Sequence, residues 1–277
     1  MAIGAMVCSY FSDKGLQYNM IRVPIGGTDF STHAYAYNEL PVNDTKLSNF
    51  TLTYEDFHYK KLEAEYEDIH IASQWHRPGP YNLPVSSDTD DKGGDASVEH
   101  AGPRDSDDMV PPAVDEDAPG SIPILEKHVD VGSWVRAKKY AIDIIDDINH
   151  DVVGWIDWNL CLNVQGGPSY TANHVDSPIL VFPEFNAFIK QPMFYAMGHF
   201  SKFVPRGSRR IEVTQKCGWK RSLWTTAFIT PQNNVVVVLY NDGKATKVNL
   251  QLGSKQAVVE MEANSMATVE LPPSVNF

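Results

Sequence analysis

The amino-acid sequence predicts an α/β part and a C-terminal antiparallel all-β domain, with an acidic segment interrupting the α/β part. An amphipathic helical pattern over 134–149 runs into an apolar strand at Val152, which is one α-then-β step of an α/β barrel or open sheet. Six short strand-like runs separated by turn residues close the chain. Between these features, residues 78–120 are rich in Asp, Pro, Ser and Gly.

The composition is that of a globular protein with a sizeable core. Hydrophobic residues make up 43% of the 277 positions and include 12 Tyr, 12 Phe and 6 Trp. The net charge of −12 argues against a nucleic-acid partner, because phosphate backbones attract Lys and Arg.

Residues 1–37 predict a loop or helix end and then the strand YNMIRVPIG, closed by Gly26 and Gly27. The opening MAIGAMV lacks a basic region and a clear cleavage site, so no signal peptide is expected. The sequence has no run of 18 apolar residues, so no transmembrane helix is expected. Residues 59–67 predict a short charged helix that leads into the strand DIHIASQW.

The negative charge is concentrated between Ser86 and Gly120, where 11 acidic residues accompany 2 basic ones. The surrounding segment 78–120 offers too little apolar surface to offset the entropy lost on ordering, so we expect disorder. A solvated insert is the favoured interpretation, and an acidic partner-binding segment is the alternative.

The strand after the predicted helix carries the most informative side chains. The helix is expected to end near Asn149, and the strand VVGWIDWNL then alternates aromatic residues with an acid and an amide. A Gly-Gly-Pro turn at 166–168 and the polar loop 173–177 follow. Indole faces beside carboxylate, amide and imidazole groups suit a sugar ring, which has an apolar C–H face and a rim of hydroxyl groups.

A second helix is expected within 190–208, and strands occupy the rest of the chain. The predicted strands are RIEVTQK, LWTTAFIT, NVVVVLYN, KVNLQL, QAVVEME and SMATVEL. Their rhythm predicts an antiparallel β-sandwich or barrel that forms a separate domain, with its boundary within 203–210.

The cysteines and histidines give no sign of a metal site or a disulfide framework. Cys8, Cys161 and Cys217 are scattered without C-x-x-C spacing, so free thiols are favoured over one disulfide. The nine histidines show no ligand spacing. We therefore expect no metal and no organic cofactor.

Two blocks of the sequence carry a family resemblance. The first is SYFSDKGLQYNMIRVPIGGTDFSTHAYAY, and the second combines VVGWIDWNLCLNVQGGPSY and NHVDSPIL with KQPMFYAMGHFSKFVPRGS. They resemble the acid β-glucosidases, the glucosylceramidases of glycoside hydrolase family 30. The closing strands resemble the β-sandwich of that family more loosely.

The resemblance implies an incomplete (β/α)8 TIM-type barrel with an appended antiparallel β-sandwich. The barrel portions would be 1–77 and 121–202, with the disordered segment 78–120 between them and the sandwich at 203–277. Together the barrel portions are shorter than a complete barrel, which typically needs about 250 residues.

The family reaction implied is retaining hydrolysis of the β-glucosidic bond of glucosylceramide, in sphingolipid metabolism. The implied substrate is glucosylceramide or another β-glucoside, the implied location is the lysosome, and the implied partners are a saposin-type activator and an acidic lipid surface. Two N-x-T sequons make Asn43 and Asn49 candidate glycosylation sites in a secreted chain, and Asn49 falls where family members carry a glycan.

The resemblance places five residues at a glucose pocket. Arg22 would lie in the barrel mouth, Asp29 would hydrogen-bond glucose hydroxyls, Trp158 would line the pocket, Asn173 would lie at its rim and Asp157 would support its wall. These positions follow strands, where barrel enzymes bind ligands. Plainer interpretations stay open: a buried ion-pair member for Arg22, a core aromatic for Trp158 and a turn or cap residue for Asp157.

The two catalytic motifs of the family, Asn-Glu-Pro for the acid/base and Ser/Thr-Glu-Ala for the nucleophile, do not occur in the chain. No catalytic residue is therefore assigned, and because retaining hydrolysis needs two carboxyl groups about 5–5.5 Å apart, little or no activity is expected. The candidate functions are a glucosylceramidase, a non-catalytic relative that binds sugar, lipid or an activator, and a β-sandwich binding module with a vestigial barrel.

Overall fold

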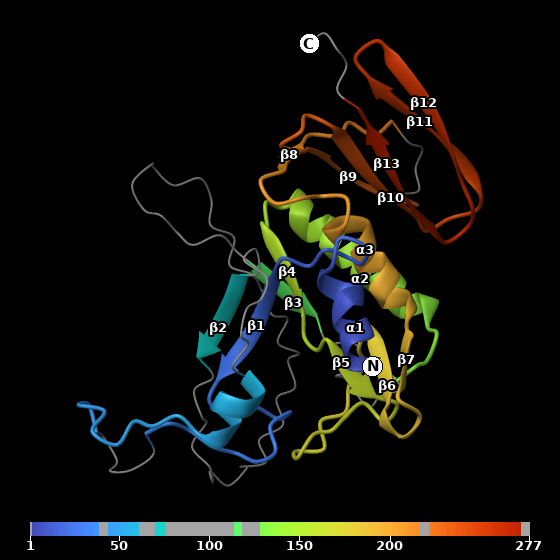
Figure 1. Cartoon of the computed structure of the whole chain (residues 1–277). Helices are drawn as coiled ribbons and strands as arrows, with labels where there is room; N and C mark the ends of the chain where they lie inside the picture. Colours follow the sequence, from blue (N-terminus) through green and yellow to red (C-terminus); the bar gives the residue numbers. More distant parts are fainter. Residues whose placement is uncertain are drawn as a thin grey trace, which may run out of the picture.

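The computed structural model describes residues 2–38, 44–60, 70–75, 114–117, 128–216 and 222–272. The helices and short parallel strand pairs lie together, and the C-terminal strands lie at one end of them (Figure 1). The first helix belongs to the α/β part, whereas the last strand belongs to the C-terminal domain.

The N-terminal part forms a helix, a parallel strand pair and a short π-helix. Helix α1 (Ala2–Phe11) precedes β1 (Met20–Ile25), which pairs in parallel with β2 (His70–Trp75). Both strands fall within the predicted segments. The π-helix η1 (Asp56–Lys60) overlaps the start of the predicted helix at 59–67, most of which lies outside the described residues.

Strand β3 (Val114–Asp117) pairs in parallel with β4 (Gly154–Asp157). Because β3 lies inside the segment expected to be disordered, that prediction is wrong for these four residues. The backbone ladder gives the physical reason, since its hydrogen bonds form whatever charge the side chains carry. Most of the remaining segment 78–120 lies outside the described residues.

Two helices form the centre of the α/β part. Helix α2 (Trp134–Asn149) ends at the residue that its periodicity predicts. Helix α3 (Pro192–Ser201) lies within the predicted range and begins with a proline, which has no N–H to leave unpaired in the first turn. The two helices pack against each other (Figure 1).

Three short strands were not predicted. Strand β5 (Cys161–Asn163) pairs in parallel with β6 (Ile179–Phe182), which pairs antiparallel with β7 (Ala187–Lys190). The one-turn 3-10 helix η2 (Pro183–Phe185) joins β6 and β7. Elements of three or four residues are too short for a periodic pattern to be recognised.

All six predicted C-terminal strands are present and antiparallel, which confirms the predicted β-sandwich. They are β8 (Arg209–Ile211), β9 (Leu223–Ile229), β10 (Val235–Asn241), β11 (Thr246–Leu252), β12 (Lys255–Met261) and β13 (Ser265–Leu271). One sheet has the order β13-β10-β9-β8, and β11 and β12 form the other. Val248 and Val259 of the second sheet pack against a core that includes Val235 and Val237 of the first.

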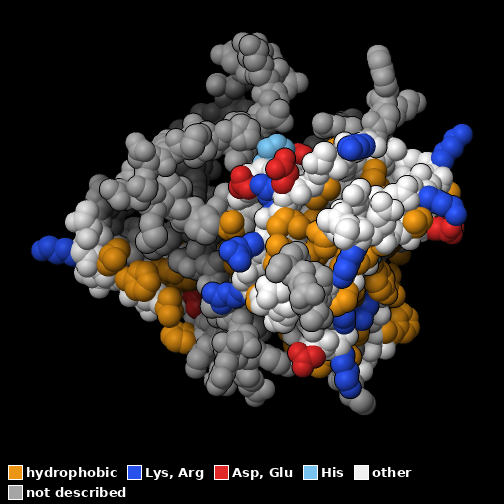
Figure 2. All heavy atoms as spheres, turned by 90° about the horizontal axis from the view of Figure 1, so that it is seen from above, with side chains coloured by type: hydrophobic (Ala, Val, Ile, Leu, Met, Phe, Trp, Pro, Cys, Tyr) orange, Lys and Arg blue, Asp and Glu red, His pale blue; other side chains and the backbone are white. Residues whose placement is uncertain are grey.

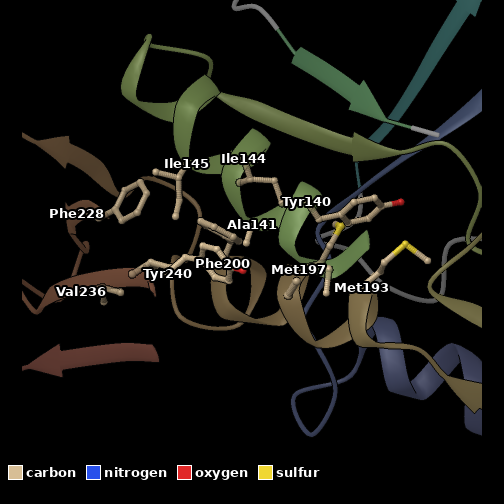
Figure 3. Close-up of a cluster of buried hydrophobic side chains, with 13 residues drawn as sticks. Tyr140, Ala141, Ile144, Ile145, Met193, Met197, Phe200, Phe228, Val236 and Tyr240 are labelled. Carbon is tan, nitrogen blue, oxygen red and sulfur yellow. The ribbon is translucent and has the colours of Figure 1, made fainter. Parts of the chain in front are cut away.

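The largest core cluster joins the α/β part to the sandwich. It combines side chains of α2 and α3 with Phe228 of β9 and Val236, Val238 and Tyr240 of β10 (Figure 3). Strand β10 is buried along its whole length, because one face packs on the helices and the other on the second sheet. The helices and the sandwich therefore share one hydrophobic core.

Stability is expected to fall on acidification because of His199, at the contact between α3 and β13. Its Nδ1 lies 2.9 Å from Oγ1 of Thr268, and burial lowers the pKa of His199. In the unfolded chain this imidazole takes up a proton near pH 6.5, whereas the folded chain resists protonation. The free energy of unfolding therefore decreases as the pH falls below that value, and it levels off below the folded pKa.

Urea unfolding of His199→Gln should show a smaller decrease of the free energy of unfolding between neutral and acidic pH than the unmodified chain. The control for the substitution itself is His150→Gln, which removes an exposed imidazole beside Asp146 at the end of α2. Equal pH dependence of His199→Gln and the unmodified chain would contradict the expectation.

The surface at the sandwich end carries charges of both signs. Figure 2 shows Lys and Arg side chains together with Asp and Glu on this face, with hydrophobic groups between them. No helix in the described part of the chain is long and apolar enough to cross a membrane.

Candidate functional site

A cavity of about 1570 Å³ is enclosed by α1, β1, β4, α3 and the segment around β8. Arg22, Asp29, Asp157 and Trp158, four of the five residues predicted to form a pocket, line it. Asn173 is not among the lining residues. Most of the exposed lining is apolar, as in small-molecule sites where a few polar groups set the orientation of the ligand.

Arg22 of β1 and Trp158, the residue after β4, meet at the cavity wall. The guanidinium carbon of Arg22 lies 4.6 Å from the centroid of the Trp158 ring, which is cation–π geometry. Burial lowers the pKa of Arg22, although a guanidinium remains protonated in proteins. The contact holds the indole against a fixed cation.

Strand β4 divides its side chains between helix α2 and the cavity. Nε1 of Trp155 donates a hydrogen bond of 2.9 Å to Oδ2 of Asp143, and the Tyr140 hydroxyl donates one of 2.9 Å to Oδ1 of Asp157. The acceptor Asp143 and the donor Tyr140 both belong to α2, so the side chains of Trp155 and Asp157 point to the same side of the strand. Trp158 directly follows the end of this strand, and its ring contacts Arg22 at the cavity wall.

Asp157 lies in a dense group of aromatic side chains. Burial first, and then the negative charge of Asp157, raise the pKa of Tyr18 well above its usual value. The pKa of Tyr10 is also raised well above its usual value by burial, with contributions from Tyr18, Asp157 and Cys161. Both phenols therefore remain neutral beside this carboxylate, and the Tyr10 hydroxyl donates to the carbonyl oxygen of Leu160.

Asp29, which lines the cavity, lies beside Asn173, which does not. Nδ2 of Asn173 donates a hydrogen bond of 2.5 Å to Oδ2 of Asp29, and the backbone N–H of Tyr170 donates one of 3.2 Å to the carbonyl oxygen of Asp29. These bonds connect the loop after β1 with the loop between β5 and β6. The structure thus brings together two predicted site residues that are distant in sequence.

Glu55 is a cavity residue that the sequence did not indicate. Its side chain is buried, lines the cavity and accepts a hydrogen bond from Oγ1 of Thr32. Nδ1 of His33 lies 3.4 Å from its Oε1, a distance that allows an ion pair when the imidazole is protonated. No motif marks Glu55, because it lies in a polar stretch without a periodic pattern.

The acidic strand β3 is the second feature that sequence reasoning missed. In its parallel register with β4, Glu116 is the partner of Ile156 and Asp117 is the partner of Asp157. Neighbouring strands in a sheet lie about 4.8 Å apart. The backbone therefore places acidic residues directly beside the strand that contributes Asp157 to the cavity.

Among the residues that the structure describes, no group of three or more His, Cys, Asp or Glu side chains is arranged to hold a metal ion. Cys8 and Cys161 are free thiols, and Cys217 lies outside the described residues. The sequon residue Asn43 also lies outside them, whereas Asn49 is exposed.

Family comparison covers most of the chain. Residues 2–82 and 105–204 match the model of the glycosyl hydrolase family 30 TIM-barrel domain, and residues 207–269 match the model of the family 30 β-sandwich domain. The boundary between the two matches agrees with the end of α3 and the start of β8.

Curated relatives carry glucosylceramidase names. Putative glucosylceramidase 3 of Caenorhabditis elegans is 27% identical over 396 residues, spanning 98% of this chain and 72% of the relative. That aligned length exceeds the 277 residues of the chain, so the alignment contains long gaps on this side. The lysosomal acid glucosylceramidase of Mus musculus is 47% identical over 116 residues, which are 42% of this chain and only 22% of the mouse protein.

Solved structures show the same fold at low sequence identity. SrfJ from Salmonella typhimurium has a TM-score of 0.72 at 15% identity, covering 99% of this chain and 85% of that protein. An endo-β-1,6-glucanase has a TM-score of 0.67 at 14% identity, covering 99% and 87%. The predicted combination of a TIM-type barrel with a C-terminal β-sandwich is therefore confirmed.

Proposed function

The chain belongs to glycosyl hydrolase family 30, and from this premise we propose that it is a glucosylceramidase-like protein that binds β-glucosides and hydrolyses them weakly or not at all. The observation that carries the proposal is the wall of the cavity, where Arg22 holds the Trp158 ring beside Asp157. The indole would cover the C–H face of a glucose ring, and Asp29 would accept hydrogen bonds from its hydroxyls.

Weak hydrolysis is proposed because the chain lacks both glutamate motifs of the family. The described carboxylates that line the cavity already have protein partners, as with Asp29 and Asn173, Glu55 and Thr32, and Asp157 and Tyr140. Loss of general acid/base help alone typically slows a reaction by about 10²–10⁴-fold. Binding survives such a loss, since it depends on the shape and polarity of the cavity.

Glucosylceramide is the proposed natural ligand, and the lysosome the proposed location, since the mouse relative is a lysosomal acid glucosylceramidase. A saposin-type activator and an acidic lipid surface are proposed partners on the same family grounds. The exposed Asn49 is the proposed glycan site in a secreted chain. These assignments depend on the family alone.

The deciding experiment measures binding and turnover in one preparation. We expect calorimetry of the full chain at acidic pH to detect binding of a glucose-like iminosugar, and a fluorogenic β-glucoside to show little or no turnover. Rapid turnover would establish an ordinary glycosidase instead. If the iminosugar did not bind, the proposed sugar site would be refuted.

A slow retaining glycosidase is a second candidate, favoured by the register of β3 against β4. The register pairs Asp117 of β3 with Asp157 of β4, and retaining enzymes use two carboxyl groups about 5–5.5 Å apart. An acidic residue of β3 could then act as nucleophile, with no general acid to assist the leaving group. A substrate whose leaving group needs no proton distinguishes this candidate from a protein that only binds, because only a nucleophile would release that leaving group.

A binding module made of the sandwich alone is the third candidate. If a chain truncated to 203–277 folded cooperatively and retained all iminosugar binding, this candidate would replace the proposed function. The shared core weighs against it, because truncation would expose Phe228, Val236 and Val238.

A further inference from the structure

A buried polar cluster on α2 and the segments before β6 and α3 has no part in the sugar contacts described above. Its centre is Asp176, which is 1% exposed, and its other members are the buried Arg136 of α2 and Gln191 before α3. Nη1 of Arg136 donates to Oδ2 of Asp176, and Nε2 of Gln191 donates to Oδ1 at 2.5 Å. We call these three residues the Asp176 cluster.

The cluster also holds backbone groups from two separate segments. The N–H of Asp130 donates to Oδ2 of Asp176 at 3.0 Å, and the N–H of Ser177 donates to Oδ1 at 2.9 Å. The carboxylate thus accepts two hydrogen bonds on each oxygen. A buried carboxylate that loses one of these partners is left with an uncompensated desolvation cost. The segments that carry the partners are therefore held in place against the interior.

The loop that precedes Asp176 is fastened at further points. The N–H of Val175 donates to the carbonyl of Gly166 at 3.2 Å, and Nδ1 of His128 lies 2.7 Å from the carbonyl oxygen of His174. Gly166 has a φ of 83°, and a Cβ there would lie 2.4 Å from the carbonyl oxygen of Val175, so only glycine permits this approach. Three residues before Asp176 lies Asn173, the residue that donates to Asp29.

We propose that the Asp176 cluster positions the loop 169–175 so that Asn173 holds the Asp29 carboxylate in the orientation that recognises a sugar hydroxyl. The proposal rests on the proposed function, because the sugar-binding role of Asp29 does. Asp176 is a positioning residue that acts through Asn173 and does not touch the ligand. Because the loop 169–175 is ordered before a ligand arrives, less conformational entropy is lost when the ligand binds.

Hydrogen exchange of the full chain tests the positioning step without any ligand. Arg136→Lys keeps the charge and removes the forked guanidinium, and it should speed exchange of the Tyr170 and Val175 amides by about tenfold or more. Lys138→Gln is the matched control, because this residue of the same helix pairs with Asp242 away from the loop and should leave both rates unchanged. Unchanged exchange in Arg136→Lys would overturn the proposal. If that variant does not fold, Gln191→Met, which preserves volume and removes the hydrogen bonds of this amide to Asp176, Ser177 and Gly132, must show the same acceleration.

Iminosugar affinity tests whether the cluster acts through Asn173. Arg136→Lys and Asn173→Ala should each lower iminosugar affinity. The affinity of the double variant should equal that of the single variant with the larger loss, because both changes disturb the same contact between Asn173 and Asp29. Additive losses would overturn the proposal. If the unmodified chain binds no iminosugar, the proposed function fails, while the exchange measurement still decides whether the cluster orders the loop.

Discussion

Trp158→Ala is expected to weaken iminosugar binding by about thirtyfold, equivalent to about 2 kcal/mol, the loss typical of a central aromatic residue in a binding site. The substitution removes the ring that Arg22 holds at the cavity wall and leaves a guanidinium with one face exposed to the cavity. Titration calorimetry of the variant and the unmodified chain measures the difference.

Two further variants separate ring stacking from general damage to the fold. Trp158→Phe keeps an aromatic face and should retain most of the affinity, whereas Tyr195→Ala removes an exposed aromatic residue of α3 that does not line the cavity and should change nothing. Equal affinity of Trp158→Ala and the unmodified chain would remove Trp158 from the site. That result would leave Trp158 as an aromatic residue of structural importance only.

A β-glucoside with a dinitrophenolate leaving group is expected to reveal any nucleophile on β3. This leaving group departs as an anion and needs no proton, so the missing general acid does not matter. The carboxylate oxygen would bond to the anomeric carbon as the bond to the phenol oxygen breaks, with the electron pair leaving on the phenolate. A burst of dinitrophenolate and a glucosyl adduct in the intact mass of the protein would identify the step.

Substitutions along β3 assign the residue. Glu116→Gln or Asp117→Asn should abolish burst and adduct if that carboxylate is the nucleophile, and Asp115→Asn, one position further from the strand end, is the matched control. The leaving group of an ordinary β-glucoside requires protonation. Without a general acid, its hydrolysis should be slower by about 10²–10⁴-fold than hydrolysis assisted by a general acid. If the activated substrate gives neither burst nor adduct, the chain only binds.

Regular elements with strong periodicity were predictable from the sequence, and very short ones were not. The apolar spacing of α2 fixed its end at Asn149, and the alternating C-terminal runs identified six strands. Strands β5 to β7 have only three or four residues, so no pattern reaches significance. Strand β3 was missed because the acidity of its neighbourhood predicts disorder, whereas its pairing depends on a partner far along the chain.

Candidate residues could be proposed from the sequence, whereas the contacts between them could not. Family resemblance selected Arg22, Asp29, Asp157, Trp158 and Asn173, and four of them line the cavity. The ring contact of Arg22 and the bond between Asn173 and Asp29 depend on packing between distant segments. Glu55 enters the cavity only through the conformation of its loop, which no local signal encodes.

The core shared by α2, α3 and the sandwich has a consequence for how this family can diverge. Every fully buried member of that cluster comes from position 137 or later in the chain. Insertions, deletions or drift in the earlier segments therefore leave the buried residues of this cluster unchanged. A lineage could exchange those earlier segments for other sequence while the two helices and the sandwich still kept their common core.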